Sequence, residues 1–525
     1  MNQTVTSTAI STDQLDASFS ALFEPRGILV AGASTHPGKF GFVSLHNVIA
    51  SGYAGKIFAT NLEGVEVLGI QTLPSLEELP QGAADLIFVC TPKSANLDLL
   101  RAAASKGVRA AFLTSAGYGE AGDQGRADEA ELVELCQELG ILLVGPNGQG
   151  VVSTPAKLCA QIVAPYPPEG GIGIASQSGN FVSSFMNWSC ATGVGVSRAV
   201  SAGNAAATSV GDFLQMYSHD PATRVGLAYV EGVTDGRRFF DQMRAVAQKI
   251  PLVVIKGGAT AGGAQAAASH TGSLANDDRT FDGACRQAGV TRAATVEEAF
   301  EAAATFATQP LPRGNKVVVM TTAGGWGVVT ADAITRDHDL ELIELPADLR
   351  EAIDAYLPPR WSGSNPVDLA GGETRDTIPK VLELVASHPQ VDAVVYLGIG
   401  IQSNQARMLS EGPFADEADV ERIIAYHQRQ DARFAQAAHD VSLATGKPIL
   451  TATELAVAFG DNAGPATVRS TGRLCYSSAD RAVTALGHMW RHSRYRILRD
   501  LPLIDGCPEA FLPTGNLLGG SVSSD

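Results

Sequence analysis

The sequence has few cysteines for its length, with seven among 525 residues. None forms a C-x-x-C pair or stands at metal-ligand spacing, so neither a disulfide framework nor a metal site is indicated, and a reduced cytoplasm is the natural setting. Long apolar runs of ~18 residues are also missing, so no membrane span is expected. The first residues have no basic start and no apolar core, which is not typical of a secretory signal.

Positive charge is in short supply as well. Lys and Arg number 38 against 55 Asp and Glu, which gives a net charge of −17. Such a field opposes non-specific binding to nucleic acid and to anionic membranes. We therefore expect neither as a partner, and an anionic ligand must be held by local geometry.

Two common nucleotide motifs are missing. No G-x-x-x-x-G-K-[ST] stretch occurs, so the sequence predicts no P-loop. No G-x-G-x-x-G opens the first predicted strand–turn–helix unit, where Ala31 stands in place of the first glycine. If ATP is used, its site lies elsewhere or on another chain.

Short apolar runs alternate with amphipathic stretches along the chain. Each run ends in a Gly- or Ser-containing turn, which predicts strand, turn and helix in repetition, and hence an α/β protein with parallel sheets covered on both faces. The predicted strands are GILVAGAS (27–34), KIFATN (56–61), DLIFVCTP (85–92), AAFLTSAGYGE (110–120), ILLVGPNG (141–148), GIGIASQSGN (171–180), VGLAYVEG (225–232), PLVVIKGG (251–258), KVVVMTT (316–322), VDAVVYLGIG (391–400) and KPILTATE (447–454).

Two Pro- and Gly-rich stretches, PYPPEGG (165–171) and TQPLPRGN (308–315), divide the chain. The α/β units that follow them open alike, which hints at a duplicated domain. The predicted division is a mobile lead (1–22), a first α/β domain (23–155), a second (166–308), a third (314–498) and a flexible tail (510–525).

Two turns have the form of anion sites. VAGASTHPGKFG (30–41) and ASQSGN (175–180) each lead from a strand into a helix, whose N-terminal N–H groups favour a phosphate. An ordinary βα turn explains the first equally well, and a capped helix start explains the second. The residue types leave these alternatives open.

One histidine stands out by its surroundings. His270 lies in AAASHTGSLAND, where small neighbours leave the imidazole uncovered and the backbone free to move. A lone histidine is usually structural, however. Glu231, at the end of the strand in AYVEGV, is a carboxylate that can accept a ring N–H and fix which nitrogen is free. Its alternative is a solvated loop acid.

A set of motifs, in order, carries a family resemblance: FEPRGILVAGASTHPGKFG, GPNG, GIGIASQSGN, VSAGN, YVEG, IKGG, ASHTGSLA, TTAGG and SNPVDL. Over roughly 22–495 the chain resembles the alpha part of ADP-forming (NDP-forming) acyl-CoA synthetases, relatives of the succinyl-CoA synthetase alpha subunit. The resemblance implies a Rossmann-like CoA-binding domain followed by two flavodoxin-like domains. It also implies an acid–thiol ligase of the cytoplasm that uses a small carboxylic acid, coenzyme A and phosphate.

The resemblance assigns roles to residues. His270 would carry the phosphoryl group between an acyl phosphate and ADP, with Glu231 against its ring. The phosphate would be bound by Ser176, Ser178 and Gly179. Coenzyme A would be bound by Gly32, Ala33, Ser34, Lys39, Asn61, Thr91, Ser115 and Asn147. No metal ligand is expected on this chain.

The chain departs from the family pattern in three places. The ATP-grasp domain has no counterpart after about residue 495, so ATP, ADP and Mg²⁺ would bind a separate beta subunit. Trp326 replaces a proline in AGGPG, and Gly148 replaces the cysteine of GPNC. The identity of the acid and the choice of ADP or GDP stay open. Two other classes remain: a CoA or acyl-CoA sensor with an unused histidine, and a nicotinamide oxidoreductase, which the missing glycine motif and Asn61 disfavour.

Overall fold

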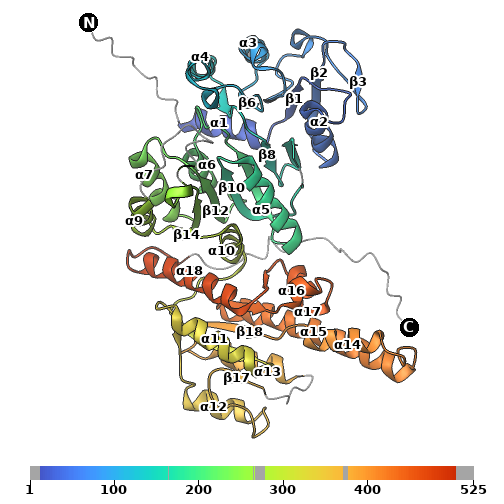
Figure 1. The fold of residues 1–525 in the computed structure, drawn as a ribbon, viewed down its shortest axis with the longest axis vertical. Helices are drawn as coiled ribbons and strands as arrows, with labels where there is room; N and C mark the ends of the chain where they lie inside the picture. Colours follow the sequence, from blue (N-terminus) through green and yellow to red (C-terminus); the bar gives the residue numbers. More distant parts are fainter. Residues whose placement is uncertain (1–11, 164, 264, 266–277, 370–375, 504–525) are drawn as a thin grey trace. The chain divides into compact units, whose positions relative to one another are not determined.

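The computed structural model describes residues 12–163, 165–263, 265, 278–369 and 376–503, which form two compact units (Figure 1). The first unit comprises the described part of Met1–Cys190 together with Val196–Arg292. The second comprises Ala191–Gly195 and the described part of Ala293–Asp525. No helix within these described ranges is both long enough and apolar enough to cross a membrane.

The first sheet of the first unit has five parallel strands in the order β2-β1-β5-β6-β7. Most of its strand residues are buried, as expected for a parallel sheet covered on both faces. The strands are β1 (Gly27–Ala31), β2 (Lys56–Thr60), β5 (Leu86–Val89), β6 (Ala110–Leu113) and β7 (Leu142–Val144), with a hairpin of β3 (Glu66–Val67) and β4 (Ile70–Gln71). The helices are α2 (Phe40–Ala50), α3 (Asn96–Ser105) and α4 (Asp123–Leu139), with short 3₁₀ turns η1 (Leu76–Glu78), η2 (Lys93–Ala95) and η3 (Gly119–Ala121).

The second sheet, also in the first unit, has the order β14-β13-β12-β10-β11-β8-β9. Its central strands β10 to β13 are parallel, whereas β8 and β9 add to one edge antiparallel. The strands are β8 (Gly150–Ser153), β9 (Leu158–Gln161), β10 (Glu169–Ser176), β11 (Val196–Ser201), β12 (Val225–Val230), β13 (Leu252–Lys256) and β14 (Thr291–Ala293). The helices are α5 (Gly179–Thr192), α6 (Val210–Tyr217), α7 (Gly236–Ala247) and α9 (Asp278–Ala288).

Strand β8 falls inside the first predicted domain, but its pairing places it in the second sheet. The first domain was predicted to extend over 23–155, but β8 pairs with β11 and not with any strand of the first sheet. The chain therefore enters the second sheet soon after β7. No linker composition marks this crossing, because it occurs inside the turn that joins β7 to β8.

Helix α1 (Thr12–Phe23) differs from the mobile lead predicted over 1–22. Phe19, Leu22 and Phe23 are buried, and Phe19 and Phe23 pack edge-on against Phe213 of the second sheet's helix α6. These three residues are spaced i, i+3 and i+4, which places them on one face of a helix. The Ser/Thr-rich composition hid this short apolar stripe. Residues 1–11 and the predicted tail 510–525 lie outside the described residues.

The third sheet, in the second unit, has the order β16-β15-β18-β19-β20, with β17 also beside β15. The strands are β15 (Lys316–Thr321), β16 (Glu341–Leu342), β17 (Val367–Asp368), β18 (Ala393–Leu397), β19 (Ile449–Ala452) and β20 (Cys475–Tyr476). The helices are α10 (Val296–Thr308), α11 (Gly324–Arg336), α12 (Ala347–Asp354), α13 (Thr377–Ser387), α14 (Ile401–Ser410), α15 (Ala418–Thr445), α16 (Leu455–Ala458), α17 (Ala463–Ser470) and α18 (Ala479–Ile497). Helix α10, expected in the domain 166–308, belongs to this unit, where Glu301 pairs with Arg481 of α18 at 2.8 Å.

All three sheets repeat one strand order. Counted along the chain, the five main strands of each sheet lie in the order 2-1-3-4-5. This is the flavodoxin-like form of the doubly wound fold, in which ligands bind beyond the carboxyl ends of the first and third strands. The α/β class is confirmed: a Rossmann-like domain precedes two flavodoxin-like domains.

Candidate functional site

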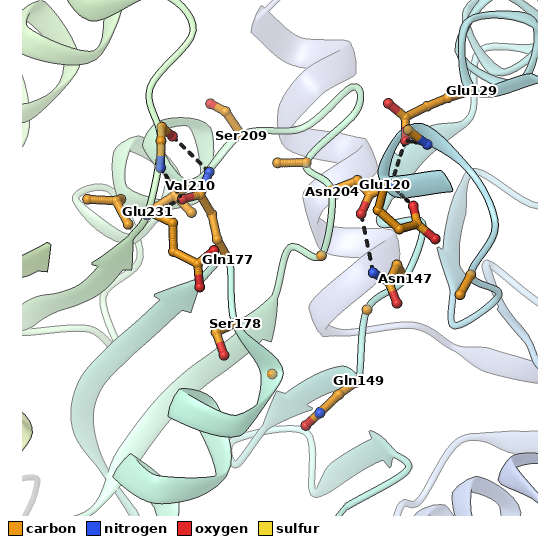
Figure 2. A pocket seen from close by; sticks show the side chains of 18 of the residues that line it. Glu120, Glu129, Asn147, Gln149, Gln177, Ser178, Asn204, Ser209, Val210 and Glu231 are labelled. Atoms are coloured by element: carbon orange, nitrogen blue, oxygen red, sulfur yellow. Dashed lines mark hydrogen bonds between the residues drawn. The ribbon is translucent and has the colours of Figure 1, made fainter. Parts of the chain in front are cut away.

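A cavity of about 930 Å³ opens in the first unit where the carboxyl ends of the first two sheets face each other (Figure 2). One wall comes from the first sheet and includes Thr91, Ser115 and Asn147, which follow β5, β6 and β7. The other wall comes from the second sheet and includes Ser178 and Glu231, which follow β10 and β12. Together with Gly179, six of the predicted site residues, from two sheets, therefore share one cavity.

The predicted residues behind β1 and β2 form a turn rather than a cavity wall. Gly32 has φ +83°, and a Cβ there would come within about 3.2 Å of the Thr91 side chain and the Cys90 backbone. Asn61 donates from Nδ2 to the Ala33 carbonyl at 2.8 Å, so its carboxamide supports the turn between β1 and α2. Lys39 is exposed beside the same turn. Gly32, Ala33, Ser34, Lys39 and Asn61 are not among the lining residues of the cavity.

The turn between β10 and α5 is closed by a buried hydroxyl. Ser176 accepts a hydrogen bond from the Ser178 N–H at 3.1 Å and donates to the Ser178 carbonyl at 2.6 Å. It is fully buried, so its hydroxyl shapes the turn. Ser178 and Gly179 reach the cavity at the start of the 14-residue helix α5, whose N–H groups and dipole favour an anion.

Glu231 is held at the cavity by its neighbours. It is 7% exposed, and its N–H donates to Oε1 of Gln177 at 2.5 Å. The Gln177 carboxamide also donates from Nε2 to the Gly232 carbonyl at 3.0 Å, so it clamps the strand end. Burial, together with the charge of Glu231, raises the pKa of Tyr229.

Sequence reasoning missed a polar cluster on the opposite wall. Asn204 donates from Nδ2 to Glu120 at 2.6 Å and to Glu129 at 2.7 Å, and its Oδ1 lies 3.4 Å from Nδ2 of Asn147 (Figure 2). Burial acts to raise the pKa of Glu120, but hydrogen bonds from Asn204 and from the N–H groups of Gly117 and Tyr118 outweigh it and lower that pKa. The cluster ties the loop after β11 to the first sheet. Its only signal in the sequence was the dipeptide Gly-Asn after an apolar strand.

Gly148 and Trp326 are the two residues that depart from the family pattern, and the structure shows what surrounds each of them. A Cβ at Gly148 would lie 2.6 Å from Cζ of Phe112 and 2.9 Å from the Ser201 carbonyl, so a cysteine there requires Phe112 to move. Trp326 lies in the first turn of α11 and donates its N–H to the Ala323 carbonyl at 3.0 Å. Proline would fit this first turn but has no N–H to donate.

His270 lies outside the described residues. The chain leaves the second sheet at the carboxyl end of β13, which pairs with β12, the strand that precedes Glu231. Residue 270 therefore lies 14 positions after the end of β13, and β13 is next to the strand that leads to Glu231. Its contact with Glu231 stays a prediction.

Comparison with known proteins places the chain in a family. Residues 26–154 match the family model of a CoA binding domain, 169–306 that of a succinyl-CoA ligase like flavodoxin domain, and 317–402 that of a ligase-CoA domain. The alpha subunits of two ADP-forming acetate–CoA ligases of Pyrococcus furiosus, I and II, are 37% and 35% identical over 72% and 71% of this chain and 82% and 80% of theirs.

A solved structure agrees with the sequence matches. The dinucleotide-forming acetyl-coenzyme A synthetase 1 of Ca. Korarchaeum cryptofilum, in complex with phosphate and ADP, superposes with a TM-score of 0.78 at 27% identity. The match covers 93% of this chain and 99% of that one. The chain belongs to the ADP-forming acyl-CoA synthetases, where it corresponds to the alpha subunits, and it is an acid–thiol ligase with a CoA-binding domain.

Proposed function

We propose that this chain is the alpha subunit of a two-part enzyme that reversibly converts a small carboxylate, coenzyme A and ATP to acyl-CoA, ADP and phosphate. A separate ATP-grasp beta subunit binds ATP or ADP with Mg²⁺. The observation that carries the proposal is the cavity on which both sheets converge, with Thr91 and Asn147 on one wall and Ser178 and Glu231 on the other. Both reactants of an acyl transfer can meet there.

In the direction of ATP synthesis, the first step exchanges sulfur for phosphate. An oxygen of inorganic phosphate attacks the thioester carbon, the C–S bond breaks, and the CoA thiolate takes up a proton. The pantetheine arm lies along the wall that the first sheet provides. The phosphate is held by the N-terminus of α5 at Ser178 and Gly179, where N–H groups and the helix dipole oppose its charge.

The second step moves the phosphoryl group to His270. A ring nitrogen attacks phosphorus, the P–O bond to the acyl group breaks, and the carboxylate leaves. Glu231 accepts the N–H of the other ring nitrogen, which keeps the attacking nitrogen unprotonated and stabilises the positive ring that forms. In the third step an oxygen of ADP attacks phosphorus, the P–N bond to the ring breaks, and the ring returns to its neutral state.

Two further parts of the proposal rest on relatives. The two Pyrococcus furiosus proteins are named as alpha subunits, which supports a partner subunit here. They are also named for acetate, which makes acetate the first acid to test. The finer identity of the acid depends on the cavity lining, which includes Ala205, Val210, Val233 and Phe239.

The test is phosphorylation of the purified chain by acetyl-CoA and phosphate. We expect one phosphoryl group on His270, stable in alkali and lost in acid, as a phosphoramidate is. His270→Ala should remove the label while calorimetric binding of CoA persists, because the CoA site is proposed on the first sheet. The control His338→Ala changes an exposed histidine of the second unit and should keep the label.

Three results would contradict the proposal. A label that survives in His270→Ala would place the phosphoryl group on another residue. An acid-stable label would indicate a hydroxyl ester on Ser269, Thr271 or Ser273, the hydroxyl residues that flank His270. CoA binding without any label would favour a CoA sensor.

A further inference from the structure

Two of the sequence motifs, GPNG (145–148) and VSAGN (200–204), lie against each other at the cavity. The N–H of Asn204 donates to the Pro146 carbonyl at 3.0 Å. Gly203 has φ +56°, and a Cβ there would lie 2.1 Å from the Pro146 oxygen, so this close approach requires glycine. The loop after β11 is therefore built onto the loop after β7.

The carboxamide of Asn204 can take only one orientation. Its Nδ2 donates to Oε2 of Glu120 at 2.6 Å and to Oε2 of Glu129 at 2.7 Å. Both carboxylates also accept backbone N–H groups from the loop 117–119. If the carboxamide were turned over, its Oδ1 would face two carboxylate oxygens at these distances with no hydrogen between them. The Nδ2 atom of Asn204 therefore stays on the acids, and its Oδ1 points to the other side.

Asn147 takes its orientation from Asn204. Its Nδ2 lies 3.4 Å from Oδ1 of Asn204, an atom that can only accept, so the amino group and not the carbonyl of Asn147 faces it (Figure 2). The backbone is fixed as well, because Asn147 has φ +60° and donates its N–H to the Ser115 carbonyl at 3.0 Å. The Oδ1 atom of Asn147 is left at the cavity wall, and no donor among the described residues contacts it.

This acceptor stands close to the place where the two walls meet. Gln149, two residues after Asn147, packs its carboxamide over the start of α5, where a Cβ on Gly179 would lie 2.1 Å from Cδ of Gln149. The reacting end of coenzyme A has to reach this place, because its sulfur exchanges with a phosphate held at Gly179. That end is cysteamine, and its only hydrogen-bond donors are an amide N–H and the thiol S–H.

We infer that Asn204 is a positioning residue for Asn147: it turns the Asn147 carbonyl oxygen toward the cavity, where that oxygen accepts a hydrogen bond from the cysteamine end of coenzyme A. The inference rests on the proposed function, which places coenzyme A along this wall. Glu120 and Glu129 act on the ligand only through Asn204. A carbonyl that is already oriented binds its donor without losing rotamer freedom, and this is the gain from preorganisation.

The test is calorimetric titration of the full chain with coenzyme A and with desulfo-CoA, which lacks the thiol. We expect Asn204→Ala to weaken the binding of coenzyme A about 3- to 10-fold, the effect of one neutral hydrogen bond. Asn147→Ala should cause the same loss, and in that background Asn204→Ala should have no further effect. An equal loss for both ligands assigns the hydrogen bond to the amide N–H, and a loss for coenzyme A alone assigns it to the thiol.

Asn204→Asp adds a measurement that a merely structural role would not change. The variant keeps the oxygen that faces Asn147 but puts a third carboxylate beside Glu120 and Glu129. Neighbouring like charges raise the pKa of such a group. At pH 8 the aspartate is repelled by the two glutamates, whereas at lower pH its protonated form can donate to one of them. The ratio of wild-type to variant affinity for coenzyme A should therefore fall as the pH is lowered from 8 to 5.

Asn47→Ala is the matched control. Asn47 of α2 also joins the first sheet's side to the second sheet, since its Nδ2 donates to the Gln161 carbonyl of β9 at 2.8 Å, but it is not among the cavity-lining residues. This variant should keep its affinity for coenzyme A. The positioning role is overturned if Asn204→Ala leaves that affinity unchanged, or weakens it equally with and without the Asn147 side chain.

The titrations separate this inference from the rest of the proposed function, because they need neither His270 nor a partner subunit. Coupling between Asn204 and Asn147 can be found in a chain that carries no phosphate on His270. A wild-type chain that binds no coenzyme A would overturn both the proposed CoA site and this inference. Binding by the wild-type chain without coupling would overturn the role of Asn204 alone.

Discussion

In both flavodoxin-like domains the first strand runs into a turn that a buried hydroxyl closes. Ser176 binds the N–H and carbonyl of Ser178, and Thr321 binds the N–H and carbonyl of Ala323 in the same way, with both distances 2.9 Å. A glycine then opens the helix in each case, Gly179 in α5 and Gly324 in α11. The duplicated fold thus presents a helix N-terminus twice.

The neighbouring strand ends differ in chemistry. The second sheet places Tyr229 and Glu231 beside its turn, and Gln177 clamps the backbone there with hydrogen bonds to the N–H and carbonyl groups of two residues. The third sheet has Leu397 and Ile399 in the same register. A fold can therefore repeat a turn that leads into a helix N-terminus without repeating the carboxylate beside it, and a few side chains on an adjacent strand set the chemical difference.

The largest effect is expected from a carboxylate placed at the strand end of the third sheet, where the second sheet has Glu231. Ile399→Glu would bury a carboxylate in the third sheet. Its neighbour two residues earlier is Leu397, whereas in the second sheet the equivalent residue is Tyr229. Raising the pKa of a buried carboxylate by about three units costs about 4 kcal/mol at neutral pH. We expect hydrogen exchange of peptides from the second unit to show this loss.

Ile399→Gln is the control because it has nearly the same shape without the charge. The difference between the two variants should shrink as pH falls, since the glutamic acid then becomes neutral. Equal stability of both variants at pH 7 would mean that the third sheet can accommodate an ionised acid, and the contrast between the sheets would be lost.

The two units should also respond differently to acid. Burial, and then the charge of Arg473, lower the pKa of His439 in α15 from 6.5 to about 4, with Asp440 opposing the shift. Below pH 6.5 His439 takes up a proton in the unfolded chain but not in the folded second unit. The free energy of unfolding of that unit therefore falls between about pH 6.5 and 4, by about 3 kcal/mol.

The first unit should resist until lower pH. Hydrogen bonds from the Arg26 side chain and N–H, and from Arg109, lower the pKa of Asp85 to about 2, although burial opposes them. Its stabilisation is complete above the unfolded pKa of 3.8 and is lost as pH falls toward 2. Lowering the pH from 7 to 5 should reduce the free energy of unfolding of the second unit alone. Urea unfolding at the two pH values, followed by hydrogen exchange, measures this. His439→Gln should flatten that response, and an unchanged response would refute it.

Much of the fold could be predicted because buried parallel strands appear in the sequence as continuous apolar runs. Runs such as VGLAYV and KVVVMT are continuous and apolar, and they form the strands Val225–Val230 and Lys316–Thr321 inside the predicted segments. The places where the prediction differed are short or rely on distant partners. Helix α1 buries its apolar stripe against Phe213 of a helix far away in the sequence, and β8 pairs with β11 through backbone hydrogen bonds that no side-chain pattern encodes.

The candidate site was predictable only at its strand ends. Glu231 and Ser178 follow apolar strands, so their place on a sheet edge could be read from position. Asn204 could not, because its partners Glu120 and Glu129 are more than 70 residues away. Tyr229 looked like an ordinary strand residue, since nothing in a period-two pattern tells which buried tyrosine stands beside a carboxylate at the strand end. Ser176 is the converse case: it was expected on the ligand, but its hydroxyl is used by the turn.

The smallest effects are expected from changes in the two turns that Ser176 and Thr321 close. Ser176→Ala and Thr321→Val each remove one buried hydroxyl and leave an N–H and a carbonyl of the turn without that partner. Each should destabilise its own unit by about 1–3 kcal/mol, a cost that unsatisfied buried groups carry in either sheet. The rate of His270 labelling should fall more in Ser176→Ala, because that turn positions Ser178 and Gly179 at the cavity that Glu231 lines. Pulse labelling with acetyl-CoA and radioactive phosphate, at a temperature where both variants are folded, measures the difference. Equal falls in the two variants would show that the third sheet's turn takes part in phosphoryl transfer despite lacking a carboxylate, and Glu231 could then no longer be what distinguishes the two domains.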